Sequence, residues 1–309
     1  MSAADAGLVE LVPDVHAWVQ PDGSWWINNA GVVCGTEGGG ALIIDTCCTA
    51  ERTRRFLSAA RRAAGQAPLR FALNTHLHGD HTYGNYLLPQ DTVLIAHEAT
   101  RAGMIADPFI DACPPVWRPA PDWSGARLRT PDLTMTGALT LHLGGRRVEL
   151  HHPGYTAHTS GDVVAWLPAE RVLFTGDLVF HRVTPLLLMG SLEGALRSVE
   201  WLAGFEADHI VPGHGGLVGG GAFRTVLAAH DRYYRFITET AAWGREEGLG
   251  PLEAANAVEL GEFAQWQDPE RLVLNLHRAY AEAQRGDVDL MAAFADAITY
   301  NGGPLHCAV

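Results

Sequence analysis

The stretch NTHLHGDH, residues 74–81, decides the fold, because three histidines and one aspartate fall within six positions. The apolar run before it, residues 69–73, predicts a short buried β-strand, and the polar side chains follow the end of that strand. His76 and His78 are two positions apart, so on an extended backbone they point to the same side. The strand end therefore carries two imidazoles that face one point.

The rest of the stretch turns back toward this point. Gly79 permits a tight turn, after which Asp80 and His81 can approach the first two histidines. Imidazole nitrogens and carboxylate oxygens around one point are typical ligands of zinc or a similar divalent cation. Four such groups rarely gather by coincidence at the end of a buried strand, so the stretch predicts a metal site.

The net charge, the cysteine count and the length of the apolar runs exclude several classes of protein. The net charge of −13 disfavours nucleic acid and anionic membranes as partners, since both need a basic protein surface. Five cysteines, an odd number with no C-x-x-C pair, predict neither a disulfide framework nor a cysteine-based zinc site. Residues 1–11 lack the features of a signal peptide, and no apolar run is long enough to span a bilayer. We therefore expect a soluble protein in the reducing cytoplasm.

The predicted strands come early in the chain and the helices late. Strands are predicted at 9–12, 15–19, 25–33, 41–45, 69–73 and 92–96, with helices at 49–64, 83–88 and 97–105. Residues 107–131 are expected to form a long ordered loop or lid. Hairpins follow at 139–151 and 162–174, then a helix at 192–203, a strand at 208–211 and helices from 222. The simplest account is one α/β catalytic domain, residues 1–220, with a helical C-terminal extension, residues 221–309, packed on it.

Three later stretches each place one polar side chain beside small residues near a predicted strand. They are PGYTAHTSGD (153–162) with His158, FTGD (174–177) with Asp177, and VPGHG (211–215) with His214. Singly each signal is weak, because an aspartate after Thr-Gly is a turn or helix-cap residue about as often as a ligand. Together with the first stretch they supply seven candidate ligands, which is enough for two metal ions.

In this order, the four stretches resemble those of the metallo-β-lactamase fold superfamily, over residues 9–215. The resemblance implies a four-layer αββα sandwich with two metals at one edge. It implies a first metal held by His76, His78 and His158, and a second held by Asp80, His81 and His214, with Asp177 bridging both. Asp45, at the end of a predicted strand, matches a position where the family often has a supporting carboxylate; the alternative role is that of a turn residue.

Details of the ligand stretches distinguish branches of this superfamily. β-Lactamases of this fold commonly have a cysteine at the position of Asp177, and no cysteine here lies in a ligand stretch, so antibiotic hydrolysis is disfavoured. The di-iron redox branch has a glutamate at the position of His78 and usually a flavodoxin domain, and this sequence shows neither. The nuclease branch shares the ligands but does not suit the acidic charge. The glyoxalase-like hydrolases fit best, and a di-iron redox protein is the alternative of a different class.

The resemblance implies a hydrolase with two divalent metal ions. Zinc is expected, although the same ligands accept iron or manganese. Two such ions can hold a bridging hydroxide and clamp the reacting oxygen of the substrate. Asp80, which orients the nucleophile, and Asp177, which fixes the metal spacing, are the predicted catalytic residues. Because thiol pKa values lie near about 8.5, a thiolate leaves with little protonation, so a thioester suits a site without an additional general acid.

The segment GSWWINNAG, residues 23–31, and the overall length are similar to those of the actinorhodin-type aromatic polyketide cyclase/thioesterases. This similarity implies an aromatic polyketide carried on an acyl carrier protein as the substrate. Another small-molecule thioester, ester or lactone hydrolase is the alternative. The candidate pocket residues near the metal edge are His181, Phe109, Trp117 and Leu187, each of which can also be an ordinary core residue.

Two further features bear on partners. The predicted helix 49–64 carries five arginines, which either dock an acidic carrier protein or form a solvated face. The C-terminal helices, from Ala222, either cover the pocket or form a homodimer interface. Both features are therefore candidates for contacts with other proteins.

Overall fold

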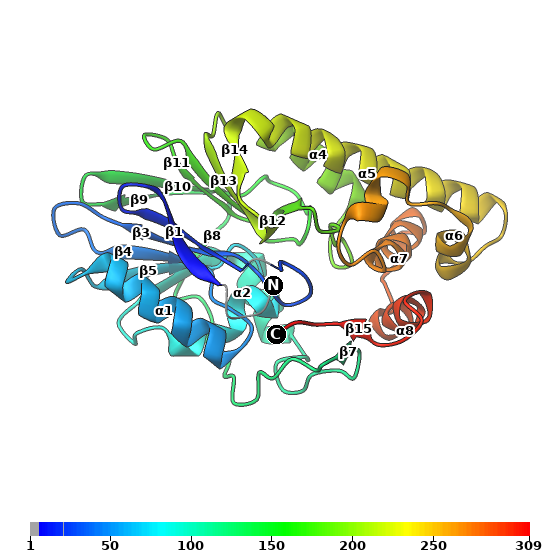
Figure 1. The fold of residues 1–309 in the computed structure, drawn as a ribbon, viewed down its shortest axis with the longest axis horizontal. Helices are drawn as coiled ribbons and strands as arrows, with labels where there is room; N and C mark the ends of the chain where they lie inside the picture. The colour runs from blue at the N-terminus through cyan, green and yellow to red at the C-terminus, as the bar shows by residue number, and fades with distance from the viewer. Residues whose placement is uncertain (1–5, 21) are drawn as a thin grey trace.

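A computed structural model describes residues 6–20 and 22–309, which form two large β-sheets (Figure 1). The first sheet has seven strands in the order β1-β2-β3-β4-β5-β6-β8. These strands are β1 (Gly7–Val12), β2 (Val15–Val19), β3 (Ala30–Cys34), β4 (Ala41–Ile44), β5 (Leu69–Leu73), β6 (Val93–His97) and β8 (Leu133–Met135). Strands β1 to β4 pair antiparallel, whereas β4, β5, β6 and β8 run parallel.

The second sheet has six strands in the order β14-β13-β12-β11-β10-β9. They are β9 (Ala138–Leu143), β10 (Arg146–His151), β11 (Val164–Leu167), β12 (Val172–His181), β13 (His209–Gly215) and β14 (Val218–Gly219). Strands β12 and β13 are parallel, and the other neighbours in this sheet are antiparallel. A small separate sheet pairs β7 (Trp117–Arg118) with β15 (Leu305–His306).

The helices complete a four-layer sandwich. They are α1 (Ala50–Ala64), α2 (Gly79–Thr82), α3 (Glu98–Ala106), α4 (Leu192–Leu202), α5 (Gly220–Glu246), α6 (Pro251–Ala257), α7 (Arg271–Ala283) and α8 (Leu290–Tyr300), with the 3₁₀ helices η2 (Tyr83–Leu87) and η3 (Gly261–Gln265). The facing sheets share an apolar core that includes Ile44 and Phe174. Helix α1 covers the outer face of the first sheet through Phe56, and α5 covers the second through Phe223. The predicted αββα architecture is therefore confirmed.

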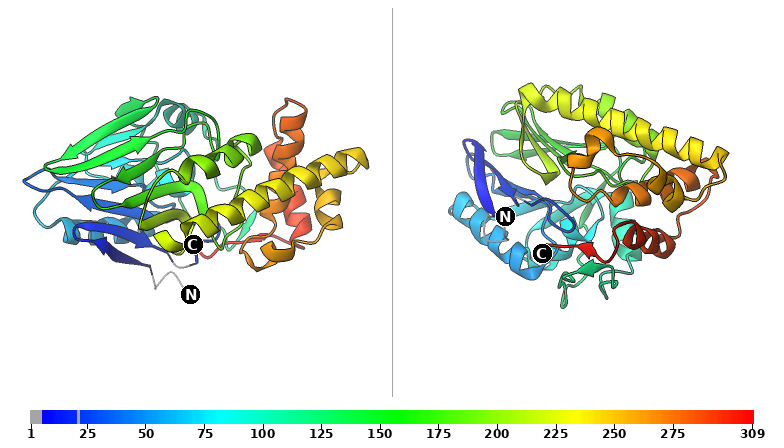
Figure 2. Two further views of the ribbon diagram at one scale, coloured as in Figure 1. Left: turned by 90° about the horizontal axis from the view of Figure 1, so that it is seen from above. Right: turned by 45° about the vertical axis from the view of Figure 1, so that its right-hand side comes forward.

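The C-terminal part of α5 and helices α6 to α8 extend beyond one end of the sandwich (Figure 2). Helices α5, α6 and α7 form an apolar cluster there with α4. Helix α8 and β15 pack beside β7, so the end of the chain lies against the long loop predicted at 107–131. None of the helices in the described part of the chain is long and apolar enough to cross a membrane.

Several expected elements have different limits in the structure. The strand predicted at 25–33 begins only at Ala30, because the polar side chains before it bond to other segments: Asn28 donates to the carbonyl of Thr46, and Asn29 to that of Gly215. The helix predicted at 83–88 begins earlier, as α2, and continues as the 3₁₀ helix η2. Strand β8 was not predicted, although it extends the first sheet beside β6.

Candidate metal centre

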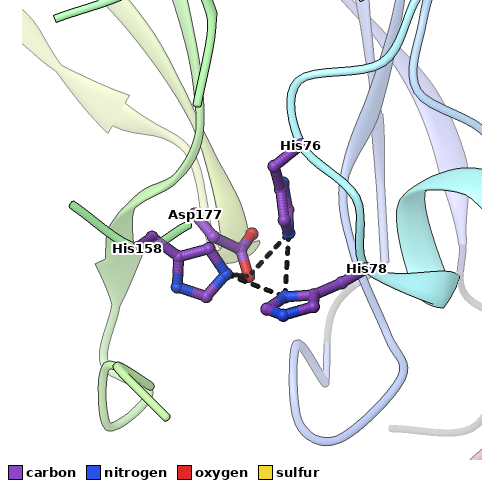
Figure 3. Close-up of side chains that lie close together, drawn as sticks. All are labelled: His76, His78, His158 and Asp177. Atoms are coloured by element: carbon purple, nitrogen blue, oxygen red, sulfur yellow. Dashed lines mark hydrogen bonds and ion pairs between the residues drawn. The ribbon is translucent and has the colours of Figure 1, made fainter. Parts of the chain in front are cut away.

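Four side chains meet where the two sheets come together: His76, His78, His158 and Asp177 (Figure 3). His76 and His78 follow β5, His158 precedes β11, and Asp177 lies within β12. His78 Nδ1 lies 3.1 Å from His76 Nε2 and 2.9 Å from His158 Nε2. Asp177 Oδ2 lies 3.4 Å from His158 Nε2 and 3.8 Å from His76 Nε2. Both sheets therefore contribute side chains to one cluster.

A second group consists of Asp80, His81 and His214. His214 Nε2 lies 3.1 Å from Asp80 Oδ2, and His81 Nε2 lies 3.6 Å from the same oxygen. Asp177 contacts this group as well, since its Oδ1 lies 3.1 Å from His81 Nε2 and its Oδ2 lies 3.3 Å from His214 Nε2. The structure thus brings all seven candidate ligands together, with Asp177 between the two groups.

Hydrogen bonds behind the first group fix its imidazole tautomers. The Thr75 hydroxyl donates to Asp45 Oδ2, so it accepts from Nδ1 of His76, 3.0 Å away. His158 Nδ1 donates to the carbonyl of Leu186 at 2.7 Å. When neutral, both rings therefore present an Nε2 lone pair, and both lone pairs face His78 Nδ1. One shared hydrogen cannot satisfy both of them, whereas a cation can.

The second group is held in the same way. His81 Nδ1 donates to Asp45 Oδ2 at 2.8 Å, and His214 Nδ1 donates to the carbonyl of Gly23 at 2.9 Å. Asp45 also accepts the Thr75 backbone N–H, so one carboxylate supports residues of both groups. Of the two roles considered for Asp45, the geometry favours that of a supporting carboxylate, which fixes ring orientation and raises ligand basicity.

The electrostatics of the two groups differ. Burial lowers the pKa of His158 to about 3 and also lowers the pKa of His76, so both imidazoles are neutral at pH 7. Burial opposes charge on His214 too, but the carboxylates of Asp177 and Asp80 outweigh it and raise the pKa to about 9. His214 and His81 in turn hold the pKa of Asp177 well below its usual range, against the effect of burial. The carboxylates of Asp80 and Asp177 therefore attract positive charge, which protons on His81 and His214 supply in the protein alone and a metal ion can supply in their place.

The donor set fits two divalent metal ions. In the protein alone, His81 Nε2 and Asp177 Oδ1 lie 3.1 Å apart without the geometry of a hydrogen bond, and both are buried with no other partner among the described residues. A cation between them would satisfy both atoms. The ring-nitrogen spacings of 2.9 and 3.1 Å in the first group are close to the roughly 3.3 Å edge of a tetrahedron with metal–nitrogen bonds of about 2.0–2.1 Å. Mixed imidazole and carboxylate ligands suit zinc, iron and manganese alike.

Two backbone features allow this close approach. A Cβ atom at Gly213 would lie 1.8 Å from Asp177 Oδ1, so only glycine fits beside the carboxylate. The pairing of β12 with β13 shifts register between Gly176 and Phe180, next to Asp177. Such irregularities re-aim side chains and are frequent beside active sites. They explain how Asp177 serves the site from within a strand rather than from its end.

An open cavity with an empty volume of about 1050 Å³ lies against this centre, with Asp80 and Asp177 in its wall. Most of the other lining side chains are apolar or aromatic. They are Trp25, Trp26, Leu77, Tyr83, Phe109, Trp117, Phe180, Leu186, Leu188, Met189, Leu290 and Phe294. The cavity therefore suits a large apolar or aromatic group held beside the metal edge.

Two of the four expected pocket residues, Phe109 and Trp117, line this cavity. The structure places the other two elsewhere. Leu187 is 2% exposed and packs into the helical cluster of α5 and α7, where its backbone N–H donates to Asn275 Oδ1 on α7. His181 lies outside the lining and donates through Nδ1 to the carbonyl of Gly216, 2.8 Å away.

Sequence reasoning did not find several lining residues. Trp25 and Trp26 line the cavity, whereas the predicted strand at 25–33 places them in a sheet. Arg271 and Phe294 come from α7 and α8. The sequence left open whether these helices cover the pocket or form a homodimer interface. No local pattern links helices that late in the chain to a site built on residues 76–81.

A family model described as Metallo-beta-lactamase superfamily matches residues 23–214, more than half of the chain. The chain belongs to the metallo-β-lactamase superfamily. Members of this superfamily are mostly metal-dependent hydrolases, and the His/Asp cluster of this metallo-β-lactamase fold indicates the same class here.

Solved structures support the fold assignment. A metallo-β-lactamase from Pontibacter korlensis is 20% identical, with a TM-score of 0.60, over 75% of this chain and 99% of that chain. The sec-alkylsulfatase Pisa1 from Pseudomonas sp. is 19% identical, with a TM-score of 0.70, over 90% of this chain and 50% of that chain. The DIM-1 metallo-β-lactamase is 21% identical, with a TM-score of 0.57, over 75% of this chain and 97% of that chain. A search of curated proteins finds no match to this sequence. At such identities, the likeness concerns the metallo-β-lactamase fold and not the substrate.

Proposed function

We propose that this protein is a dinuclear-metal thioesterase that acts on an aromatic polyketide intermediate carried on an acyl carrier protein, in natural-product biosynthesis. The observation that carries the proposal is the aromatic-walled cavity of about 1050 Å³ in direct contact with Asp80 and Asp177. Aromatic side chains favour a flat acyl group through stacking and burial. The cavity is open and its wall is mostly apolar, which suits an aromatic acyl group that enters from the surface.

The residues of the centre have distinct roles in this proposal. When bound, two divalent cations supply Lewis acidity that polarises the acyl carbonyl and lowers the pKa of water. His76, His78 and His158 would hold one cation, and Asp80, His81 and His214 the other. Asp177 presents an oxygen to each group and so fixes their separation. Asp80, in the cavity wall, accepts a hydrogen bond from the attacking water and orients it toward the acyl carbon.

A thioester suits the remaining machinery better than an oxygen ester or an amide. A thiol has a pKa of about 8.5, so its anion leaves without a proton from a dedicated acid. Ester and lactone hydrolysis is the alternative within the same fold, and it differs in requiring more assistance for the leaving group. Di-iron redox chemistry is the alternative of another class, and elemental analysis together with the colour of the purified protein separates it from a zinc hydrolase.

The carrier protein is proposed to dock on helix α1 by charge complementarity. Arg54, Arg61 and Arg62 are exposed on this helix. Arg52 does not contribute, since it is buried and donates to Gln20 and to the carbonyl of Ala308. The docking surface is therefore the exposed arginine face of α1.

The test is a panel of N-acetylcysteamine thioesters with aromatic or acetyl acyl groups, together with the matched oxygen esters. Burial of an aromatic ring is worth about 1.5–3 kcal/mol, so we expect kcat/KM for the aromatic thioester to exceed that for the acetyl thioester by about 10- to 100-fold. We expect the oxygen esters to react more slowly. Equal rates for aromatic and acetyl groups, or a preference for the oxygen esters, would argue against the proposal.

A further inference from the structure

Asp107 is the one carboxylate in the described cavity wall that does not belong to the metal centre. It caps the C-terminal end of α3, where the loop 107–131 begins. The other charged residue outside the centre is Arg271, whose guanidinium is already engaged with Asp268 at 2.8 Å and with the carbonyl of Thr184 at 3.0 Å. In a cavity that is mostly apolar, a few placed polar groups decide which ligands are accepted.

The Asp107 carboxylate is oriented but not saturated. Its Oδ2 accepts a hydrogen bond from the Tyr83 hydroxyl at 2.7 Å, and its Oδ1 accepts from the Phe109 backbone N–H at 2.8 Å. A carboxylate has about four lone-pair positions, so two of them are left by these bonds. Asp107 is only half-buried, in contrast to the fully buried Tyr83 that holds it. The carboxylate can therefore accept a further hydrogen bond from a ligand.

Tyr83 is fixed by its surroundings. A Cβ atom at Gly79 would lie 2.4 Å from the Tyr83 ring, so the ring packs directly on the turn that carries Asp80 and His81. The ring also stacks on Trp26, with centroids 6.2 Å apart and planes at 25°, and lies 5.2 Å from the ring of Trp123. A phenol hydroxyl is a hydrogen-bond donor and an ionised carboxylate only an acceptor, so the Tyr83 hydroxyl donates to Asp107.

We propose that Asp107, oriented by Tyr83, is a specificity-determining residue that accepts a hydrogen bond from a hydroxyl group on the acyl part of the substrate. The inference rests on the proposed thioesterase function, because it assigns the acyl group to this cavity. An acyl group with a hydroxyl meets an acceptor that is already aligned. An acyl group that ends in a carboxylate beside Asp107 meets a like charge instead, which weakens its binding.

A purely structural role for this pair makes a different prediction. The Tyr83–Asp107 bond also ties the loop 107–131 to the metal turn, so its loss can loosen the whole wall. A looser wall lowers the affinity for every ligand by the same factor. Recognition instead changes the ratio between a ligand that carries the hydroxyl and one that lacks it.

The experiment measures binding of non-hydrolysable analogues, in which a methylene replaces the thioester sulfur. The analogues carry 3-phenylpropanoyl, its 3-hydroxyphenyl and 4-hydroxyphenyl counterparts, and a 4-carboxyphenyl counterpart, and the readout is quenching of tryptophan fluorescence. A hydrogen bond to a charged group is worth about 1.5–3 kcal/mol, so we expect one hydroxyl isomer to bind about 10- to 100-fold tighter than the parent. In Asp107→Asn the preference falls to within about threefold and the carboxyphenyl analogue gains affinity. The matched control, Asp111→Asn, removes an exposed charge from the same loop and keeps the preference.

The outcomes separate the possibilities. Equal binding of parent and hydroxyl analogues by the unaltered protein, or an equal loss for both in Asp107→Asn, overturns the inference. If Asp107→Asn does not fold, Tyr83→Phe replaces it, since release of the carboxylate lowers the ratio between the affinities of the hydroxyl analogue and the parent analogue. Hydrolysis of the matching thioesters is measured in parallel. No hydrolysis together with an intact hydroxyl preference rejects the thioesterase proposal but not the role of Asp107.

Discussion

Asp45 shows how one residue outside the ligand set controls several ligands. Its carboxylate accepts from His81 Nδ1 at 2.8 Å and from the Thr75 hydroxyl at 2.7 Å, and Thr75 in turn fixes His76. Its backbone has φ of 58°, a conformation that asparagine and aspartate tolerate better than most residues. Asparagine at this position therefore keeps the turn but cannot accept all of these hydrogen bonds.

We expect Asp45→Asn to fold normally and to lose metal affinity by about 10- to 100-fold, the usual effect of removing a group that supports a metal ligand. Competition with a coloured chelator measures the affinity, and circular dichroism verifies the fold. Asp14→Asn is the matched control, since Asp14 also has a positive φ of 67° but is exposed and outside the described metal centre. An unchanged affinity in Asp45→Asn would refute the supporting role.

His230 provides a pH test that is independent of the metal ligands. This buried side chain accepts the Phe180 backbone N–H at Nε2 and donates from Nδ1 to the carbonyl of Val226. Burial lowers its pKa to about 4. In the unfolded chain the imidazole binds a proton below about pH 6.5, whereas in the folded protein it stays neutral until about pH 4. Its contribution to stability is therefore present at pH 7 and lost as the pH falls.

Between pH 7 and pH 5, this single group should lower the free energy of unfolding by about 2 kcal/mol. His230→Gln lacks the titration, so the stability difference between the unaltered protein and the variant should shrink by that amount at pH 5. Urea unfolding at the two pH values measures the difference. The exposed His142→Gln is the control, and a difference for His230→Gln that is constant with pH would contradict the assignment.

At the scale of single elements, the ligand-bearing segments were predictable and the cavity was not. Four of the seven ligands fall within the short stretch 74–81, so the sequence alone indicates a metal site there. Strand β5 before them occurs at the expected residues, Leu69–Leu73. Helix α1 likewise matches the helix predicted at 49–64, with Thr49 as its N-cap and Gly65 as its C-cap. The cavity instead depends on contacts between α7, α8 and the segment around Trp25, which lie some 250 residues apart in the chain. Local periodicity contains no information about such long-range packing.

Helix α1 is the element on which carrier docking depends. Replacing Arg54 and Arg61 by glutamate reverses two exposed charges on the same face of the helix, two turns apart, and leaves its buried side intact. We expect kcat/KM for a carrier-bound thioester to fall about tenfold, because surface charges mainly set the rate at which the two proteins associate. The loss should be greater at low salt, where these charges are less screened. The small N-acetylcysteamine thioester should react as before. Arg224→Glu, exposed on α5, is the control, and equal loss on both substrates would reject docking on α1.

At the scale of the whole molecule, the metal centre joins the two sheets. The first sheet and the turn after β5 supply Asp45 and the four ligands within residues 76–81. The second sheet and its loops supply His158, Asp177 and His214. Neither half holds a complete group, so the site exists only when the sandwich is closed, and the helical extension then walls the cavity beside it. The fold class and the seven ligands followed from the sequence because each ligand lies in a short local pattern, while their mutual distances required the packed sandwich.

The most direct test of the account is anomalous X-ray diffraction at the zinc edge, from crystals of the full chain grown with excess zinc. We expect two anomalous peaks about 3.5–4 Å apart, one beside His76, His78 and His158 and the other beside Asp80, His81 and His214, with Asp177 between them. A single peak, or none within reach of these side chains, would contradict the dinuclear centre on which the proposed hydrolysis depends.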